Sequence, residues 1–104
     1  MEQILQIGDA PIDSASLAEL CRRFSVRELS YFGSAARGQM RHDNDIDILV
    51  DFLPESTIDL VDYAGLMLDL SRLIGRRVDL VPKNGLKPSI RASFPSEARP
   101  LYAA

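Results

Sequence analysis

The most regular alternation of apolar and polar residues in the chain covers residues 45–52, DIDILVDF. Successive side chains of an extended strand point to opposite faces, so this stretch predicts a strand with one apolar face and one acidic face. The apolar face consists of Ile46, Ile48, Val50 and Phe52. Two further stretches predict strands, because they are rich in β-branched and aromatic residues or alternate in the same way: residues 26–32, VRELSYF, and residues 76–82, RRVDLVP.

A first helix is predicted from Ser14 to Phe24, where apolar residues recur at helical spacing. Ser16 and Glu19 are three positions apart and predict a capping box at its start. Cys21 lies on the apolar side of this helix, so we expect it to be a buried core residue rather than a reactive thiol.

The longest helix is expected between residues 57 and 74, with Ser56 or Thr57 as its cap and Gly75 as its C-terminal stop. Its expected core face consists of Leu60, Ala64, Met67 and Ile74. Residues 34–40 permit one or two helical turns, and residues 86–94 permit a short last helix. The tail that follows contains two prolines and is expected to be irregular or extended.

The composition indicates one globular domain covering residues 1–104, since 104 residues close a single core. The 12 basic and 15 acidic residues give a net charge of -3. A surface that binds nucleic acid has to neutralise its phosphates, so nucleic acid is an unlikely partner. A single cysteine excludes an internal disulfide and a cysteine-based zinc site. No stretch is typical of a secretory signal or a membrane span, so we expect a cytoplasmic protein.

Gly33 and Ser34 form a candidate phosphate-binding turn. They stand between a predicted strand and a short predicted helix, where free backbone N–H groups and a hydroxyl favour an anion. Gly33 would let a phosphate approach the backbone closely, and Ser34 would donate a hydrogen bond to it. By itself a Gly-Ser pair is more often an ordinary turn.

Asp45, Asp47 and Asp79 form a candidate metal site. Asp45 and Asp47 leave the same face of one strand about 6.5 to 7 Å apart along the chain. Asp79 stands opposite the apolar Val78 and Leu80, so all three carboxylates share one side if these strands are neighbours. Hard oxygen ligands suit Mg²⁺ or Mn²⁺, and a cation would relieve the repulsion between crowded carboxylates. A D-x-D pair alone is more often a solvated strand face.

The joint pattern resembles a known family. GSAARGQMRHDNDIDILVDF, followed by VDLVP and LKPSIR, is similar to the minimal nucleotidyltransferases (the MNT group) of the DNA polymerase beta superfamily. The resemblance covers about residues 15–92. Two departures, Ala35 in place of a larger or basic residue and Asn44 in place of a serine, remove none of the predicted metal ligands.

The resemblance implies an α/β (α+β) fold, with a mixed sheet of about three strands packed with about four helices. It also implies transfer of a nucleoside monophosphate from ATP or another nucleoside triphosphate, with pyrophosphate as the leaving group. By this resemblance Asp45, Asp47 and Asp79 are catalytic, Asp79 also helping to activate the attacking hydroxyl. Gly33, Ser34 and Arg37 match positions that hold phosphate, although Arg37 also fits a solvent-facing side chain.

The MNT group usually pairs with a HEPN-domain toxin, so the resemblance implies an antitoxin that transfers AMP to a hydroxyl of that partner. A non-catalytic antitoxin or scaffold that covers a HEPN-type protein is the alternative, and modification of a small molecule is less favoured because no second domain is expected. Arg41 and His42 stand in the loop before the acidic pair, where they could reach phosphate or be solvated. The nucleotide, the acceptor and the choice between monomer, homodimer and hetero-oligomer stay open.

Overall fold

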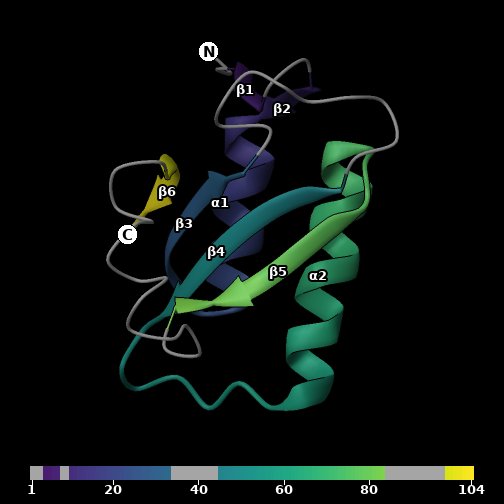
Figure 1. Cartoon of the computed structure of the whole chain (residues 1–104). Coiled ribbons are helices and arrows are strands. Elements are labelled where there is room, and N and C mark those ends of the chain that lie inside the picture. Colours follow the sequence, from purple (N-terminus) through teal and green to yellow (C-terminus); the bar gives the residue numbers. More distant parts are fainter. Residues whose placement is uncertain (1–3, 8–9, 34–44, 84–97) are drawn as a thin grey trace.

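The computed structural model describes residues 4–7, 10–33, 45–83 and 98–104, and its main feature is a mixed four-stranded sheet. The strand order is β5 (Val78–Pro82), β4 (Ile46–Phe52), β3 (Val26–Phe32) and β6 (Arg99–Ala103). Two helices cover one face of the sheet, α1 (Ser14–Arg23) behind β3 and α2 (Leu60–Ile74) behind β5 (Figure 1). The α/β fold expected from the sequence is therefore confirmed.

The three strands predicted from the sequence all form, and their pairing gives the sheet its mixed character. β3 pairs with β4 in antiparallel fashion, whereas β4 and β5 are parallel and α2 connects them. A parallel pair needs such a crossover because the chain must return to the same end of the sheet. β5 begins at Val78, two residues later than predicted.

α1 begins at the predicted residue but has a different cap, and α2 begins later than predicted with a different cap. In α1 the cap is Asp13, which accepts hydrogen bonds from the Ala15 backbone N–H and the Ser16 hydroxyl, so the predicted Ser16–Glu19 capping box is wrong. In α2 the capping box joins Asp59 and Asp62, rather than starting at residue 56 or 57. A carboxylate accepts the free N–H groups of a first turn as well as a hydroxyl does, which made the serines and threonine misleading.

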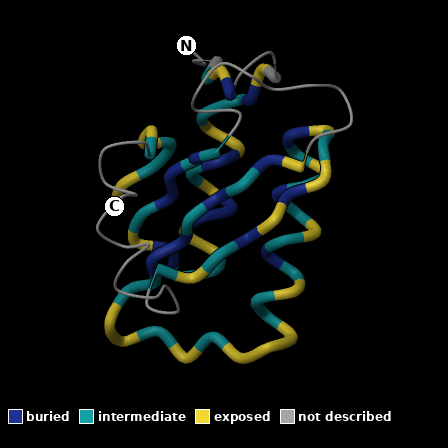
Figure 2. Tube along the Cα trace, viewed as in Figure 1, coloured by how far each residue is buried: buried dark blue, intermediate teal, exposed yellow. Residues whose placement is uncertain are grey.

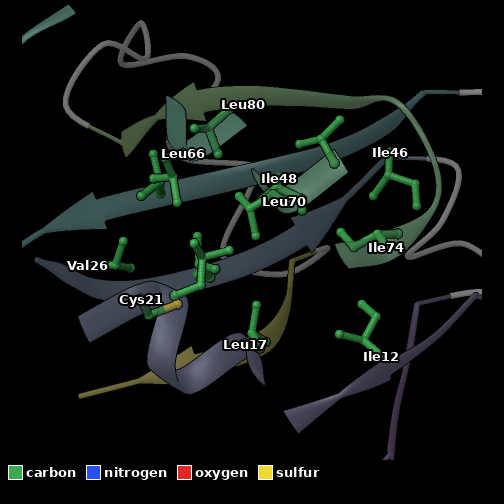
Figure 3. Close-up of a cluster of buried hydrophobic side chains, with 14 of the residues drawn as sticks. Ile12, Leu17, Cys21, Val26, Ile46, Ile48, Leu66, Leu70, Ile74 and Leu80 are labelled. Atoms are coloured by element: carbon green, nitrogen blue, oxygen red, sulfur yellow. The ribbon is translucent and has the colours of Figure 1, made fainter. Parts of the chain in front are cut away.

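The core lies between the sheet and the two helices (Figures 2 and 3). It includes Cys21, which is fully buried as expected, and burial raises the pKa of its thiol to about 12. The core face of α2 consists of Leu66, Leu70 and Ile74. The predicted core positions Leu60 and Ala64 are instead exposed. Apolar residues occur on all sides of this helix, so the sequence alone does not show which side faces the core.

Two parts of the described chain form strands that the sequence analysis did not predict. β1 (Ile4–Ile7) and β2 (Ala10–Asp13) make a separate antiparallel pair ahead of α1. The tail, expected to be irregular or extended, forms β6 and pairs with β3 at the sheet edge. Pro100 is tolerated there because an edge strand can leave one side without hydrogen bonds.

The short helices expected at residues 34–40 and 86–94 lie outside the described residues. No helix in the described part of the chain is both long and apolar enough to cross a membrane.

Candidate active site

The parallel pairing of β4 and β5 brings two of the predicted metal ligands side by side. In the register of these two strands Asp47 is the partner of Asp79. The pair Ile46 and Val78 precedes them, and the pair Ile48 and Leu80 follows them. Neighbouring strands lie about 4.8 Å apart, so the two carboxylates leave adjacent positions of the sheet. Residues that are 32 positions apart in the sequence (79 − 47) thus share one local site.

All three predicted acids lie on the face of the sheet that points away from the helices. Their strand neighbours Ile46, Ile48, Val78 and Leu80 are 0 to 6% exposed and pack in the core. Because side chains alternate along a strand, Asp47 and Asp79 must point the other way, and Asp45 directly precedes β4 with the same parity. Asp45 and Asp79 are exposed, and Asp47 is partly buried.

Asp45 faces a positive charge that the sequence analysis did not include in the site. Its Oδ1 lies 4.0 Å from Nε of Arg77, and the Ile46 backbone N–H donates to the Arg77 carbonyl oxygen at 2.9 Å. The sequence places Arg77 only in the predicted strand at 76–82, without a role in the site. Its place could have been predicted, since Arg77 and Asp79 are two positions apart and share a strand face.

Gly33 lies directly against the carboxylate of Asp47. It follows β3, whose last residue Phe32 is the cross-strand partner of Asp47. Gly33 has a φ of 72°, and a Cβ built on it would lie 2.5 Å from Oδ2 of Asp47. A side chain at position 33 would therefore occupy space next to the acid, in a backbone conformation that favours glycine. The group that lies close to Gly33 in the structure is Asp47, and the approach of a phosphate to Gly33 stays a prediction.

Several predicted site residues lie outside the described residues. These are Ser34 and Arg37 of the phosphate-binding prediction, together with Arg41, His42 and Asn44. Their roles stay predictions.

The donors present suit a small divalent cation at Asp47 and Asp79. Both offer hard carboxylate oxygens from adjacent strands, which is the ligand chemistry of Mg²⁺ and Mn²⁺. Within the described ranges, no three His, Cys, Asp or Glu side chains are grouped closely enough to hold a metal ion as they stand. Oδ1 of Asp45 lies beside Arg77, and Asp45 does not form a group of three ligands with Asp47 and Asp79 as the described residues stand.

Tyr63 of α2 also lies near the acids, and sequence reasoning missed it. Its hydroxyl donates a hydrogen bond of 2.5 Å to the carbonyl oxygen of Leu80, the residue after Asp79. Burial raises the pKa of the Tyr63 phenol, and the negative charge of Asp79 raises it further. No local sequence signal identifies this residue, because its position depends on how α2 packs against β5.

An open pocket of about 620 Å³ lies at the opposite ends of β4 and β5 from Asp47 and Asp79. It is lined by Phe52, Leu53, Pro54, Ser56, Ile58, Asp59, Leu60, Tyr63 and Pro82. Its carboxylate, Asp59, caps α2 through the Asp62 backbone N–H. This pocket is mostly apolar and its carboxylate is already used as a helix cap, so the face that carries Asp47 and Asp79 is the better candidate for a metal site.

Comparison with known proteins assigns this geometry to a family. The profile of the nucleotidyltransferase domain matches residues 14–101. The chain is 47% identical over 77 residues to protein adenylyltransferase MntA of Thermococcus cleftensis, an alignment that covers 74% of this chain and 76% of the relative.

Solved structures have the same fold. A structure described as a candidate minimal nucleotidyltransferase is 41% identical, with a TM-score of 0.71, and the match covers 84% of this chain and 87% of that one. A chain from the complex of a tri-AMPylated HEPN toxin of Shewanella oneidensis with an MNT antitoxin is 20% identical, with a TM-score of 0.61. That match covers 88% of this chain and 70% of the other, and at this identity it supports the fold alone.

Proposed function

This chain belongs to the nucleotidyltransferase domain family, and from that membership we propose that it transfers AMP from ATP to a hydroxyl group of a partner protein. Nucleotidyl transfer is the activity of the family. AMP as the transferred group, Mg²⁺ or Mn²⁺ as the cation and a HEPN-class protein as the acceptor are our proposal. The relative named a protein adenylyltransferase and the complex of an AMP-modified HEPN toxin with an MNT antitoxin support it.

The observation that carries the proposal is the register of β4 and β5. It places Asp47 next to Asp79, with Gly33 against the Asp47 carboxylate. Two adjacent carboxylates offer hard oxygen ligands to one cation, and the missing side chain of Gly33 lets the Asp47 carboxylate occupy its position. When bound, the cation would neutralise charge on the triphosphate and on the leaving pyrophosphate.

Each residue has a separate proposed role. Asp47 and Asp79 would hold the cation, and Asp45 would be a further ligand. Asp79 also accepts the proton of the acceptor hydroxyl. The hydroxyl oxygen then forms a bond to the α-phosphorus, the bond from that phosphorus to the bridging oxygen breaks, and pyrophosphate leaves. Gly33, having no side chain, lets the Asp47 carboxylate lie against the turn that follows β3.

Intact-mass spectrometry of a HEPN-class partner, incubated with this protein, ATP and Mg²⁺, tests the proposal. We expect the partner to gain mass in steps of one AMP. Asp47→Asn should lower the rate of this gain by at least about 100-fold, since even residues that only support metal ligands contribute about 10-fold to 100-fold. Glu55→Gln makes the same change of charge at an exposed acid outside the site and should leave the rate unchanged.

The same experiment separates transfer from simple covering of the partner. If Asp47→Asn neutralises the partner's toxicity as well as the unchanged protein does, and no AMP adduct forms with either, the protein acts by binding and the transfer proposal is wrong.

A further inference from the structure

The strand that carries Asp79 is an edge strand, and its backbone is held from outside the sheet. Among the strands that the structure describes, β5 pairs with β4 alone, so its other edge faces away from them (Figure 1). An edge strand paired on one side can shift its register, and a shift by one residue would turn Asp79 toward the core. The position of Asp79 beside Asp47 therefore depends on what fixes β5 at this edge.

Two hydroxyl groups of α2 bind the free edge of β5. The Val78 backbone N–H donates to Oγ of Ser71 at 3.1 Å, and the hydroxyl of Tyr63 donates to the Leu80 carbonyl oxygen at 2.5 Å. Val78 and Leu80 are the residues directly before and after Asp79. The backbone on both sides of the acid is thus hydrogen-bonded to the same helix.

Both hydroxyl groups are themselves held in place. Ser71 Oγ donates to the Met67 carbonyl oxygen at 2.9 Å, which leaves its lone pairs directed at the Val78 N–H. The ring of Tyr63 packs against Phe52 of β4, with ring centroids 6.3 Å apart. The helix that carries them is anchored in the core by its buried leucines.

We propose that Tyr63 and Ser71 are positioning residues of the active site, which keep Asp79 level with Asp47 so that the two carboxylates bind one cation. This inference rests on the proposed role of Asp79 in holding that cation. Neither residue needs to touch the nucleotide, because each acts through the backbone of β5. A merely structural role would lower stability without changing how the site binds a cation.

Binding of Mn²⁺ alone, followed by electron paramagnetic resonance of the free ion, tests the proposal without catalysis. Tyr63→Phe and Ser71→Ala should each weaken Mn²⁺ binding, and the double variant should weaken it by about 10-fold to 100-fold, the usual effect of residues that support metal ligands. Ser71→Thr keeps a hydroxyl and should restore binding. Tyr102→Phe at the opposite sheet edge and Ser16→Ala in α1 are matched controls and should bind as the unchanged protein does.

Combining each variant with Asp79→Asn shows whether the effect passes through Asp79. If it does, Tyr63→Phe should weaken Mn²⁺ binding no further in the Asp79→Asn protein, a coupling that a double-mutant cycle measures. Hydrogen exchange at the Val78 amide should become faster in Ser71→Ala, which verifies that the contact exists in solution.

The outcomes separate this inference from the proposed function. If Asp79→Asn abolishes Mn²⁺ binding while folded Tyr63→Phe and Ser71→Ala bind it normally, the positioning role is wrong and the metal role of Asp79 stands. If Asp79→Asn binds Mn²⁺ and transfers AMP normally, the proposed role of Asp79 is wrong, and the positioning role is wrong with it.

Discussion

β4 and β5 have two faces with opposite compositions. On the helix side Ile46, Ile48, Val78 and Leu80 are apolar and at most 6% exposed, whereas on the other side the strands carry Asp47 and Asp79 in adjacent positions. The first face contributes stability by removing apolar surface from water, and the second places two like charges side by side, which opposes folding. Substitutions on the helix side of these strands should therefore change mainly the stability of the fold, and substitutions on the other side should change mainly the chemistry of the site.

The largest expected effect on stability is at the buried face. Ile48 is 0% exposed, so Ile48→Ala should lower the free energy of unfolding by about 2 to 5 kcal/mol, because it loses buried methyl groups and leaves a cavity. Leu49→Ala, on the other face of the same strand and partly exposed, is the matched control and should have a clearly smaller effect. Urea denaturation followed by circular dichroism measures both. Equal losses would contradict the division between the faces.

Gly33 and Gly75 offer a matched pair of substitutions. Both have positive φ, 72° and 76°, so alanine at either should destabilise the fold by roughly 1 to 2 kcal/mol. A Cβ at position 33 meets Asp47 Oδ2, whereas a Cβ at position 75 meets nothing within 4 Å. We therefore expect Gly33→Ala alone to reduce AMP transfer by folded protein. Equal activity of the two variants would show that space beside Asp47 is not needed.

The buried thiol of Cys21 should make stability depend on alkaline pH. Burial raises its pKa from 9.0 to about 12, so the folded protein holds this proton more tightly than the unfolded chain. The stabilisation that comes from this held proton is complete well below pH 9 and is lost as the pH rises toward 12, by about 1 kcal/mol between pH 9 and pH 10. The thermal midpoint of Cys21→Ala, lower throughout because of the cavity, should fall less over this interval. Parallel curves for both proteins would contradict the prediction.

The smallest expected effect is a gain of stability at the acidic face. Without metal, Asp79→Asn removes one of two facing charges and should raise the free energy of unfolding by roughly 0.2 to 1 kcal/mol. Glu55→Gln changes the net charge equally at an exposed position and controls for the overall charge. Denaturation in the presence of a chelator measures both. A loss of stability in Asp79→Asn would show that Asp79 is not under repulsive strain there.

The sequence predicted the local features of this fold better than the contacts between its elements. The strand at 45–52 was predicted because alternation decides which side of a strand is buried. The shared face of Asp47 and Asp79 followed from the same parity argument. The orientation of α2 was not predictable in this way, since exposed Leu60 and buried Leu66 are both leucine and only packing distinguishes them.

Contacts between distant segments account for what the sequence analysis missed. β6 forms because a proline-containing tail pairs with the edge of β3, about 70 residues earlier in the chain. The hydrogen bonds from Tyr63 and Ser71 to β5 depend on how the helix is placed against the sheet. The spacing of apolar residues within each of these segments does not predict their contacts with distant segments.

The missing side chain of Gly33 bears on how related genomes are interpreted. Aspartates at the three acidic positions would ordinarily be taken as the mark of an active enzyme. In this structure any larger residue at position 33 would collide with the Asp47 carboxylate. We therefore expect homologous genes that keep all three acids but encode a bulky residue at this position to have lost nucleotide transfer, a class of silent paralogues that an inventory of acidic residues would overlook.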